Sequence, residues 1–198
     1  MSARHRIAVF VSGTGRHLEN LARLCAAGEL DAEVVLCVSN RAGVGALGRA
    51  ERAGVPTAVL APEPDETDEA WGRRAFDAVE AAGADTVVLA GFLKKLWIPE
   101  RWRGRIVNIH PSLLPAFGGK GCYGMRVHRA VVERGCQVTG CTVHVVDEVY
   151  DNGPILLQRW CEVRADDTPE DVAARVFAEE LIALPEGLAR FWQSGERP

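Results

Sequence analysis

Asn108 and His110 are the residues whose types and spacing first suggest chemistry. They follow the apolar run Ile106-Val107, so a carboxamide and an imidazole stand two positions apart at the end of a predicted strand. Side chains two apart in a strand project from the same face. An amide donates hydrogen bonds and an imidazole exchanges protons near neutral pH, so this pair can stabilise an oxyanion and then discharge it.

The same two residues also have a plainer interpretation. An Asn in a turn often bonds backbone groups, and a His can be a hydrogen-bonded core residue. Pro111 and Pro115 fix φ just beyond the strand, which predicts a stiff loop. The complete string 108–115, Asn-Ile-His-Pro-Ser-Leu-Leu-Pro, favours the chemical interpretation.

This string resembles the signature of the folate-dependent formyltransferases. Four more segments that resemble the family occur in order along nearly the whole chain: Ser39-Asn40, Val88 to Phe92, Gly140 to His144 and Gly153 to Gln158. Five motifs in the family's order are too many for coincidence.

The resemblance implies that a formyl group moves from 10-formyltetrahydrofolate, a co-substrate, to an amine, with no metal and no covalent enzyme intermediate. Asn108 and protonated His110 are expected to stabilise the oxyanion of a tetrahedral intermediate. Asp151 stands in the family's Asp-x-Gly-Pro pattern. It is expected to orient His110 and to help a water relay the proton, although acidic loops are ordinarily solvated turns.

The acceptor amine favoured by the resemblance is 5'-phosphoribosylglycinamide, on the route of de novo purine biosynthesis. A glycine turn before a predicted helix presents backbone amides to an anion. It lacks the third glycine, and the second strand lacks a terminal acid, which argues against a nicotinamide cofactor. The candidates for binding the acceptor phosphate and ribose are Gly13, Thr14, Gly15, Arg16, His17 and, through the resemblance, Glu180.

Two positions depart from the family pattern and leave the acceptor open. The family loop continues Gly-Ser-Asn-Leu, whereas this chain reads Gly15-Arg16-His17-Leu18, and Phe177 stands where a polar residue or Lys often meets the phosphate. Arg16 can grip a phosphate with two hydrogen bonds, or it can indicate another acceptor. The alternative is therefore a paralogous N-formyltransferase acting on a different small amine.

The resemblance places the folate on the segment after Ala90-Gly91-Phe92 and on the acidic loop. The folate-binding candidates are Leu93, Lys94, Leu96, Val146, Asp147, Glu148, Val149 and Asp151. Leu93 and Leu96 are equally compatible with ordinary core positions. The glycine-rich segment 118–124 predicts a mobile cover, and His128 after it is either a family histidine or a surface residue.

The elements that position these residues follow from the apolar pattern. Apolar runs alternate with helical patterns in the first half, which is typical of parallel strands buried on both faces. Later, the runs 138–146 and 155–163 predict an antiparallel hairpin, and a last helix is expected from about 166–169 to Pro185. We expect an α/β fold with a mostly parallel, Rossmann-like sheet flanked by helices and antiparallel strands at the C-terminal end. The site should lie outside the carboxyl ends of the strands.

Length, composition and charge exclude several classes of protein. With 198 residues, 47% of them hydrophobic, one domain over 1–198 is expected. A net charge of −4 without a basic run argues against nucleic acid, and six cysteines without metal-ligand spacing argue against structural zinc. No apolar stretch approaches the roughly 20 residues of a membrane span, and Met1–Arg6 leads directly into a strand. Small-molecule substrates, no membrane partner, a cytoplasmic location and a monomer or homodimer are expected.

Other members of the family and other classes of protein fit the chain less well. Methionyl-tRNA formyltransferase has a C-terminal tRNA-binding domain for which 198 residues leave no room, and formyltetrahydrofolate deformylase has an N-terminal regulatory domain. A non-catalytic folate- or nucleotide-binding module would keep the loops and lose the Asn-His-Asp set. All three residues are present here, which favours an enzyme.

Overall fold

The structure, a computed structural model, describes residues 4–193. Its contacts divide the chain near residue 106 into unit 1 (4–106) and unit 2 (107–193). The ends of the expected domain 1–198, including the first three positions of the Met1–Arg6 segment, lie outside the described residues.

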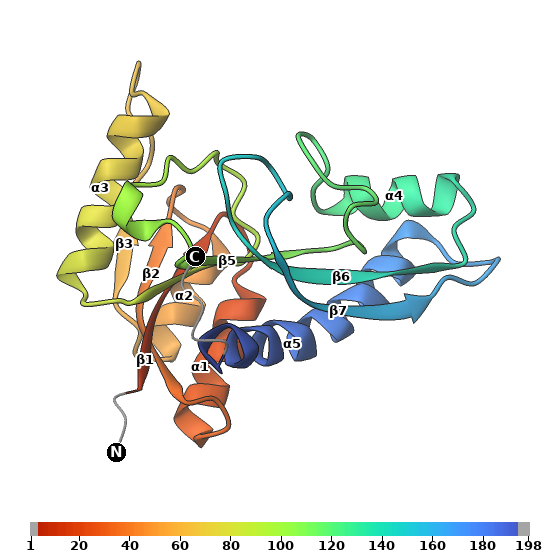
Figure 1. Cartoon of the computed structure of the whole chain (residues 1–198), viewed down its shortest axis with the longest axis horizontal. Coiled ribbons are helices and arrows are strands. Elements are labelled where there is room, and N and C mark those ends of the chain that lie inside the picture. The colour runs from red at the N-terminus through yellow and green to blue at the C-terminus, as the bar shows by residue number, and fades with distance from the viewer. Residues whose placement is uncertain (1–3, 194–198) are drawn as a thin grey trace. The chain divides into compact units, whose positions relative to one another are not determined.

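Unit 1 is a repeated strand-helix unit, visible in the red to yellow-green ribbon of Figure 1. Its strands pair in parallel in the order β3-β2-β1-β4. β1 is buried on both faces, as its continuous apolar run predicted, because every residue from Ile7 to Val11 is fully buried. The elements are β1 His5–Val11, α1 Arg16–Ala27, β2 Ala32–Ser39, α2 Gly45–Arg52, β3 Thr57–Val59, α3 Asp68–Ala81, β4 Thr86–Leu89 and the 3-10 helix η1 Glu100–Trp102.

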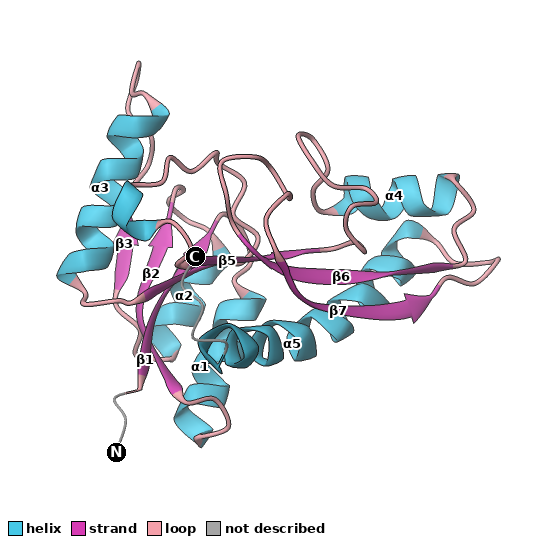
Figure 2. Cartoon of the chain, in the orientation of Figure 1, coloured by secondary structure: helices cyan, strands magenta, loops and turns pink. Residues whose placement is uncertain are grey.

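Unit 2 contains the antiparallel strands. β5 pairs antiparallel with β6, and β6 with β7, so the predicted hairpin is confirmed (Figure 2). The elements are β5 Ile106–His110, whose first residue belongs to unit 1, α4 Met125–Glu133, β6 Val138–Val145, β7 Ile155–Glu162 and α5 Pro169–Gln193. Asn108 and His110 belong to the end of β5, as predicted, and His110 is its last residue.

The strand order of the seven-stranded sheet is β3-β2-β1-β4-β5-β6-β7. The expected fold class, a mostly parallel sheet with antiparallel strands at its C-terminal end, is confirmed.

The predicted end of the last helix near Pro185 is wrong. α5 continues through Pro185 to Gln193. Proline removes one backbone donor from a helix and crowds the preceding turn. Packing on β6 outweighs that loss, because Leu184 and Leu188 are buried and Gly187 lies so close to Val143 that an added Cβ would meet its Cγ1 at 2.6 Å.

The cysteines are free thiols. Cys25, Cys37, Cys141 and Cys161 are buried among the apolar residues of the core. Burial raises the pKa of Cys37 to about 11 and that of Cys141 to about 12, which makes both poor nucleophiles at neutral pH. Within residues 4–193, no helix is long and apolar enough to cross a membrane.

Gly140 in β6 tests the packing of the hairpin. A Cβ there would lie 2.0 Å from the carbonyl oxygen of Arg159 and 2.8 Å from the Cα of Trp160, both backbone atoms of β7. We expect Gly140→Ala to lower the free energy of unfolding by about 2–3 kcal/mol, measured by urea denaturation. Gly48→Ala in α2 is the control, since the added Cβ has only the end of Arg52 within 4 Å and should raise stability by up to about 1 kcal/mol. A neutral Gly140→Ala would contradict the packing.

Candidate active site

The pairing of β5 with β6 assembles the polar side chains of unit 2. Asn108 lies opposite His144, and His110 lies opposite Thr142. Residues two apart share a face, so all four side chains project from the same side of the two strands. The Nδ2 of Asn108 lies 3.0 Å from the Nε2 of His144.

Asp151 connects this strand face to the loop after β6. Its Oδ1 lies 3.4 Å from the Nδ1 of His110 and 3.8 Å from the Nε2 of His144. Its Oδ2 accepts a hydrogen bond from the backbone N–H of Gly119 at 2.9 Å. The carboxylate, predicted from the family pattern alone, therefore lies beside both histidines.

His110 has an acceptor beside each ring nitrogen. Its Nε2 lies 2.9 Å from the carbonyl oxygen of Phe117, which can only accept, and its Nδ1 faces the carboxylate of Asp151. The side chain is only 5% exposed. The arrangement offers an acceptor to both protons of an imidazolium, the form that a proton donor needs.

His144 is a site residue that the sequence analysis did not single out. Its Nδ1 lies 3.0 Å from the carbonyl oxygen of Val145, which places a proton there and leaves Nε2 to accept from the amide of Asn108. Burial lowers the pKa of His144, which favours this neutral form. The available signal was its position two residues after Thr142 in a predicted strand, inside a segment that resembles the family.

The loop after β6 turns sharply to return Asp151 to the strands. Gly153 permits the turn, because an added Cβ would lie 1.9 Å from the carbonyl oxygen of Val145. Asp151 itself has a φ of +55°, a left-handed conformation that Asp tolerates better than most residues. Asp147 accepts hydrogen bonds from the backbone of Val149 and the side chain of Asn152, both at 2.8 Å, so it supports the loop from within.

The folate candidates of unit 2 differ in exposure. Val149 is 61% exposed, Glu148 is also exposed, and Val146 and Asp147 are half-buried. Tyr150, in the same loop, is 45% exposed and adds an aromatic ring beside Val149. Exposed apolar side chains on a loop are available for contact with a flat ring.

His128 and Glu180 occupy the helices of unit 2. Both are buried, His128 on α4 and Glu180 on α5, so the surface interpretation of His128 is wrong. Burial lowers the pKa of His128, and the charges of Glu180 and His110 act on it in opposite directions. The Nδ1 of His128 is buried without a hydrogen-bond partner.

In unit 1 the predicted acceptor loop connects β1 to α1. The carbonyl oxygens of Gly13 and Thr14 accept hydrogen bonds from the backbone N–H of Ala46 (3.1 Å) and the Nε of Arg49 (3.0 Å), which fixes the loop on α2. Gly15 has a φ of +76°, and an added Cβ would lie 2.5 Å from Ala46. Only glycine fits this turn.

The helix α1 begins immediately after that turn. Arg16 is its first residue and is exposed, and His17 is half-buried. The first amides of a helix have no partner within the helix and carry partial positive charge, which favours an anion at this end. The loop and α1 of unit 1 therefore have the features of a phosphate site.

The folate candidates of unit 1 lie after β4. Leu93 is 48% exposed and Leu96 is half-buried, so neither is an ordinary core residue. The Nζ of Lys94 lies 2.6 Å from the Oδ1 of Asp68 and 5.4 Å from the ring centre of Trp71. The segment thus presents an apolar side chain beside a cation.

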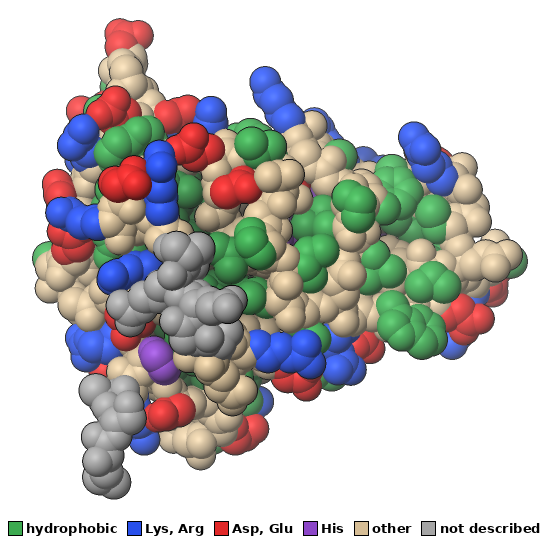
Figure 3. Space-filling view, viewed as in Figure 1, with side chains coloured by type: hydrophobic (Ala, Val, Ile, Leu, Met, Phe, Trp, Pro, Cys, Tyr) green, Lys and Arg blue, Asp and Glu red, His purple; other side chains and the backbone are tan. Residues whose placement is uncertain are grey.

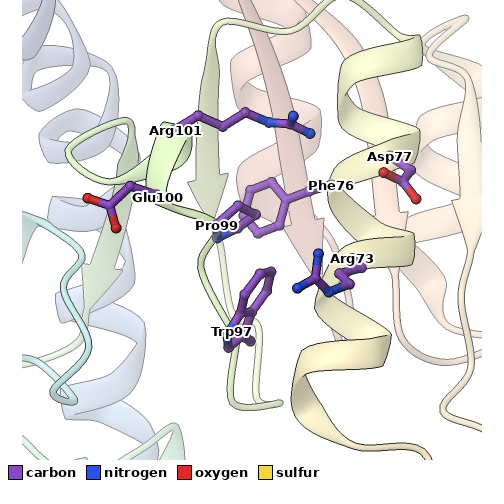
Figure 4. A pocket seen from close by; sticks show the side chains of 7 residues that line it. All are labelled: Arg73, Phe76, Asp77, Trp97, Pro99, Glu100 and Arg101. Carbon is purple, nitrogen blue, oxygen red and sulfur yellow. The ribbon is translucent and has the colours of Figure 1, made fainter.

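Unit 1 also has a cavity of about 430 Å³ that contains none of the predicted residues (Figure 4). Phe76, Trp97 and Pro99 form its apolar part. Its two arginines are occupied: Arg73 pairs with Glu69 and stacks on Trp97 at 4.9 Å, and Arg101 pairs with Glu80. The other two ionisable lining residues, Asp77 and Glu100, are acidic, so their charges balance those of the two arginines.

The surface shows how charge is distributed. On the face drawn in Figure 3, basic and acidic side chains of unit 1 alternate without a continuous basic patch. Among the described residues, no group of three or more His, Cys, Asp or Glu side chains is arranged to hold a metal ion.

The chain matches one family of known proteins over most of its length. Residues 5–188 match the family described as formyl transferase. The chain belongs to this family.

Two relatives show which proteins of this family the chain is similar to. The chain is 42% identical over 180 residues to "Phosphoribosylglycinamide formyltransferase, chloroplastic" of Arabidopsis thaliana, covering 89% of this chain and 62% of the relative. It is 41% identical over 190 residues to "Trifunctional purine biosynthetic protein adenosine-3" of Gallus gallus, covering 92% of this chain and 18% of the relative. The chain thus spans about three-fifths or less of the length of these relatives.

The fold is also similar to that of a solved structure. Glycinamide ribonucleotide transformylase 1 from Symbiobacterium toebii has a TM-score of 0.91 and 36% identity, covering 98% of this chain and 90% of that one.

The buried histidines of unit 2 predict a pH dependence. Burial lowers the pKa of His128 and of His144 below the usual 6.5, so below pH 6.5 the unfolded chain binds protons that the folded chain does not. Stability should therefore fall as the pH drops from 7.5 to 5.5, by up to about 1.4 kcal/mol per pH unit for each histidine. Urea titrations measure this loss, and His128→Leu should lose less than the wild type over the interval. An equal loss in both proteins would contradict the prediction.

Proposed function

We propose that the chain transfers the formyl group of 10-formyltetrahydrofolate to the amine of 5'-phosphoribosylglycinamide, a step of de novo purine biosynthesis. The observation that carries the proposal is the arrangement in unit 2, where the carboxylate of Asp151 lies 3.4 Å from the Nδ1 of His110 and Asn108 shares the strand face. The similarity to a phosphoribosylglycinamide formyltransferase and to a glycinamide ribonucleotide transformylase supports this acceptor over another small amine.

The chemistry needs no covalent enzyme intermediate. The amine attacks the formyl carbon, and negative charge develops on the formyl oxygen. The amide of Asn108 and the imidazolium of His110 donate hydrogen bonds to that oxygen. Asp151 orients His110 and accepts, through a water, a proton from the ammonium that forms when the amine has attacked. The tetrahedral intermediate then expels tetrahydrofolate, which leaves with that proton.

His110 must exchange a bond to act in this way. Its Nε2 here donates to the carbonyl oxygen of Phe117, and Gly119 donates to Asp151. The glycine-rich segment 118–124 that follows allows the cover to move when substrates bind. We propose that the formyl oxygen replaces the carbonyl oxygen of Phe117 as the acceptor.

The residues proposed to bind the folate form two groups, one after β4 in unit 1 and one in the loop after β6 in unit 2. The exposed apolar side chains of Leu93 and Val149 suit the flat pterin ring, and Lys94 supplies a cation for a carboxylate. The complete proposed set is Leu93, Lys94, Leu96, Val146, Asp147, Glu148, Val149 and Asp151.

The acceptor is proposed to bind with its phosphate on the loop of unit 1. Backbone amides at a helix start and the guanidinium of Arg16 suit a phosphate monoester, and Glu180 suits the ribose hydroxyls. The proposed set is Gly13, Thr14, Gly15, Arg16, His17 and Glu180.

Several broader properties accompany this proposal. We propose that both units act as one formyltransferase domain, since the family match of residues 5–188 spans both. Free thiols support a reducing compartment, for which we propose the cytoplasm, although the plant relative is named chloroplastic. The acting form is proposed to be a monomer or homodimer, without nucleic-acid or membrane partners.

Substitution of the strand residues tests the mechanism. Asn108→Ala and His110→Ala should each lower kcat for formyl transfer to phosphoribosylglycinamide by on the order of 10²-fold or more, the usual effect of losing an oxyanion donor or a general acid. Steady-state assays of the folded variants measure this. The exposed Gln137 of unit 2 offers a control, since Gln137→Ala should keep wild-type turnover. Wild-type kcat in either strand variant removes that residue from the mechanism.

Substitution of Arg16 tests whether the acceptor carries a phosphate. If its guanidinium binds the acceptor phosphate, Arg16→Ser should raise the acceptor KM, measured with phosphoribosylglycinamide, about 10-fold or more and leave the KM of the folate co-substrate unchanged. Arg16→Lys should recover only part of the loss, because the ammonium keeps the charge without the planar fork.

If the acceptor carries no phosphate, the kinetic results should differ. The wild type would then formylate phosphoribosylglycinamide poorly, and inorganic phosphate would not compete. An unchanged acceptor KM in Arg16→Ser refutes the role of Arg16.

A further inference from the structure

Ser12 connects the loops that follow three strands of unit 1. It lies at the end of β1 and is 3% exposed. Its hydroxyl donates a hydrogen bond to the Oδ1 of Asn40 at 2.8 Å and accepts one from the backbone N–H of Leu93 at 2.9 Å. Its own backbone N–H donates to the carbonyl oxygen of Gly91 at 3.1 Å. One small side chain therefore links the ends of β1 and β2 with the segment after β4.

The linked segments are those to which the proposed function assigns two substrates. Gly13, the residue after Ser12, begins the loop proposed for the acceptor phosphate, and Leu93 begins the segment proposed for the folate. The acceptor loop is already fixed on α2 through its carbonyl oxygens. The bond from Leu93 to Ser12 extends that fixed arrangement to the second segment.

We propose that Ser12 is a positioning residue that holds the acceptor loop and the folate segment of unit 1 at the spacing at which both substrates bind. This inference rests on the proposed function. The hydroxyl is suited to the task because it donates one bond and accepts another in a buried place, where both bonds have no competition from water. Alanine would leave the N–H of Leu93 and the Oδ1 of Asn40 without this partner.

Ser39 provides a matched control within the same sheet. It lies at the end of β2, next to β1, and is fully buried. Its hydroxyl also donates one bond and accepts one, but both partners are the backbone of Arg41, at 2.8 and 3.2 Å. Ser39→Ala therefore removes the same two kinds of bond without separating two substrate segments.

The test compares Ser12→Ala, Ser39→Ala and the wild type in thermal melts and in steady-state kinetics with each substrate varied. The melting temperature should fall by a similar amount in both variants. Ser12→Ala should raise the KM values of the folate co-substrate and of phosphoribosylglycinamide about tenfold each, whereas Ser39→Ala should leave both within twofold. Equal KM changes in the two variants, or unchanged values in Ser12→Ala, overturn the proposal.

Two further measurements cover the remaining outcomes. If Ser12→Ala does not fold, Asn40→Ala removes one of the two links, and a rise of about threefold in both KM values supports the proposal while unchanged values overturn it. If the wild type formylates no phosphoribosylglycinamide, the proposed function fails first. Calorimetric binding of inorganic phosphate and of 10-formyltetrahydrofolate to Ser12→Ala and Ser39→Ala then decides the inference, and a wild type that binds neither ligand overturns it.

Discussion

The register of β5 against β6 is the constraint on which the site of unit 2 depends. It places Asn108 opposite His144 and His110 opposite Thr142, all on one face. A slip by one residue would turn every one of these side chains to the opposite face. The register is itself held by burial, because the intervening residues, Ile109 and Val143, belong to the apolar core. Burial of the apolar face of β5 and β6 therefore positions the polar side chains on their other face.

On this strand face, Asp151 is the group that joins separate segments. Its two carboxylate oxygens face His110, His144 and the backbone of Gly119. The left-handed backbone at Asp151 is one of the few non-glycine positions with positive φ among the described residues, and such conformations often occur at functional sites. Tight backbone contact at Gly153 holds the loop in that conformation.

In unit 1, hydrogen bonds fix the loops that follow the ends of parallel strands. The loop proposed for the acceptor is fixed on α2 through its carbonyl oxygens, by Ala46 and Arg49. The buried hydroxyl of Ser12 then links this loop to the next one. Rigid support of this kind reduces the ordering that substrate binding would otherwise require.

The sequence by itself determined the strands and most of the helices, because apolar periodicity and turn residues act over a few neighbouring positions. It also singled out Asn108, His110 and Asp151 as candidates, through spacing and through a resemblance, and these three lie close together in the structure. Only the tertiary structure decided that His144 joins them, that α5 continues past Pro185, and that Ser12 bridges two loops. Each of these depends on a partner distant in the chain: Asn108 for His144, β6 for α5, and Asn40 and Leu93 for Ser12. Local patterns carry no information about such partners, because burial and hydrogen-bond geometry arise only when the strands pair.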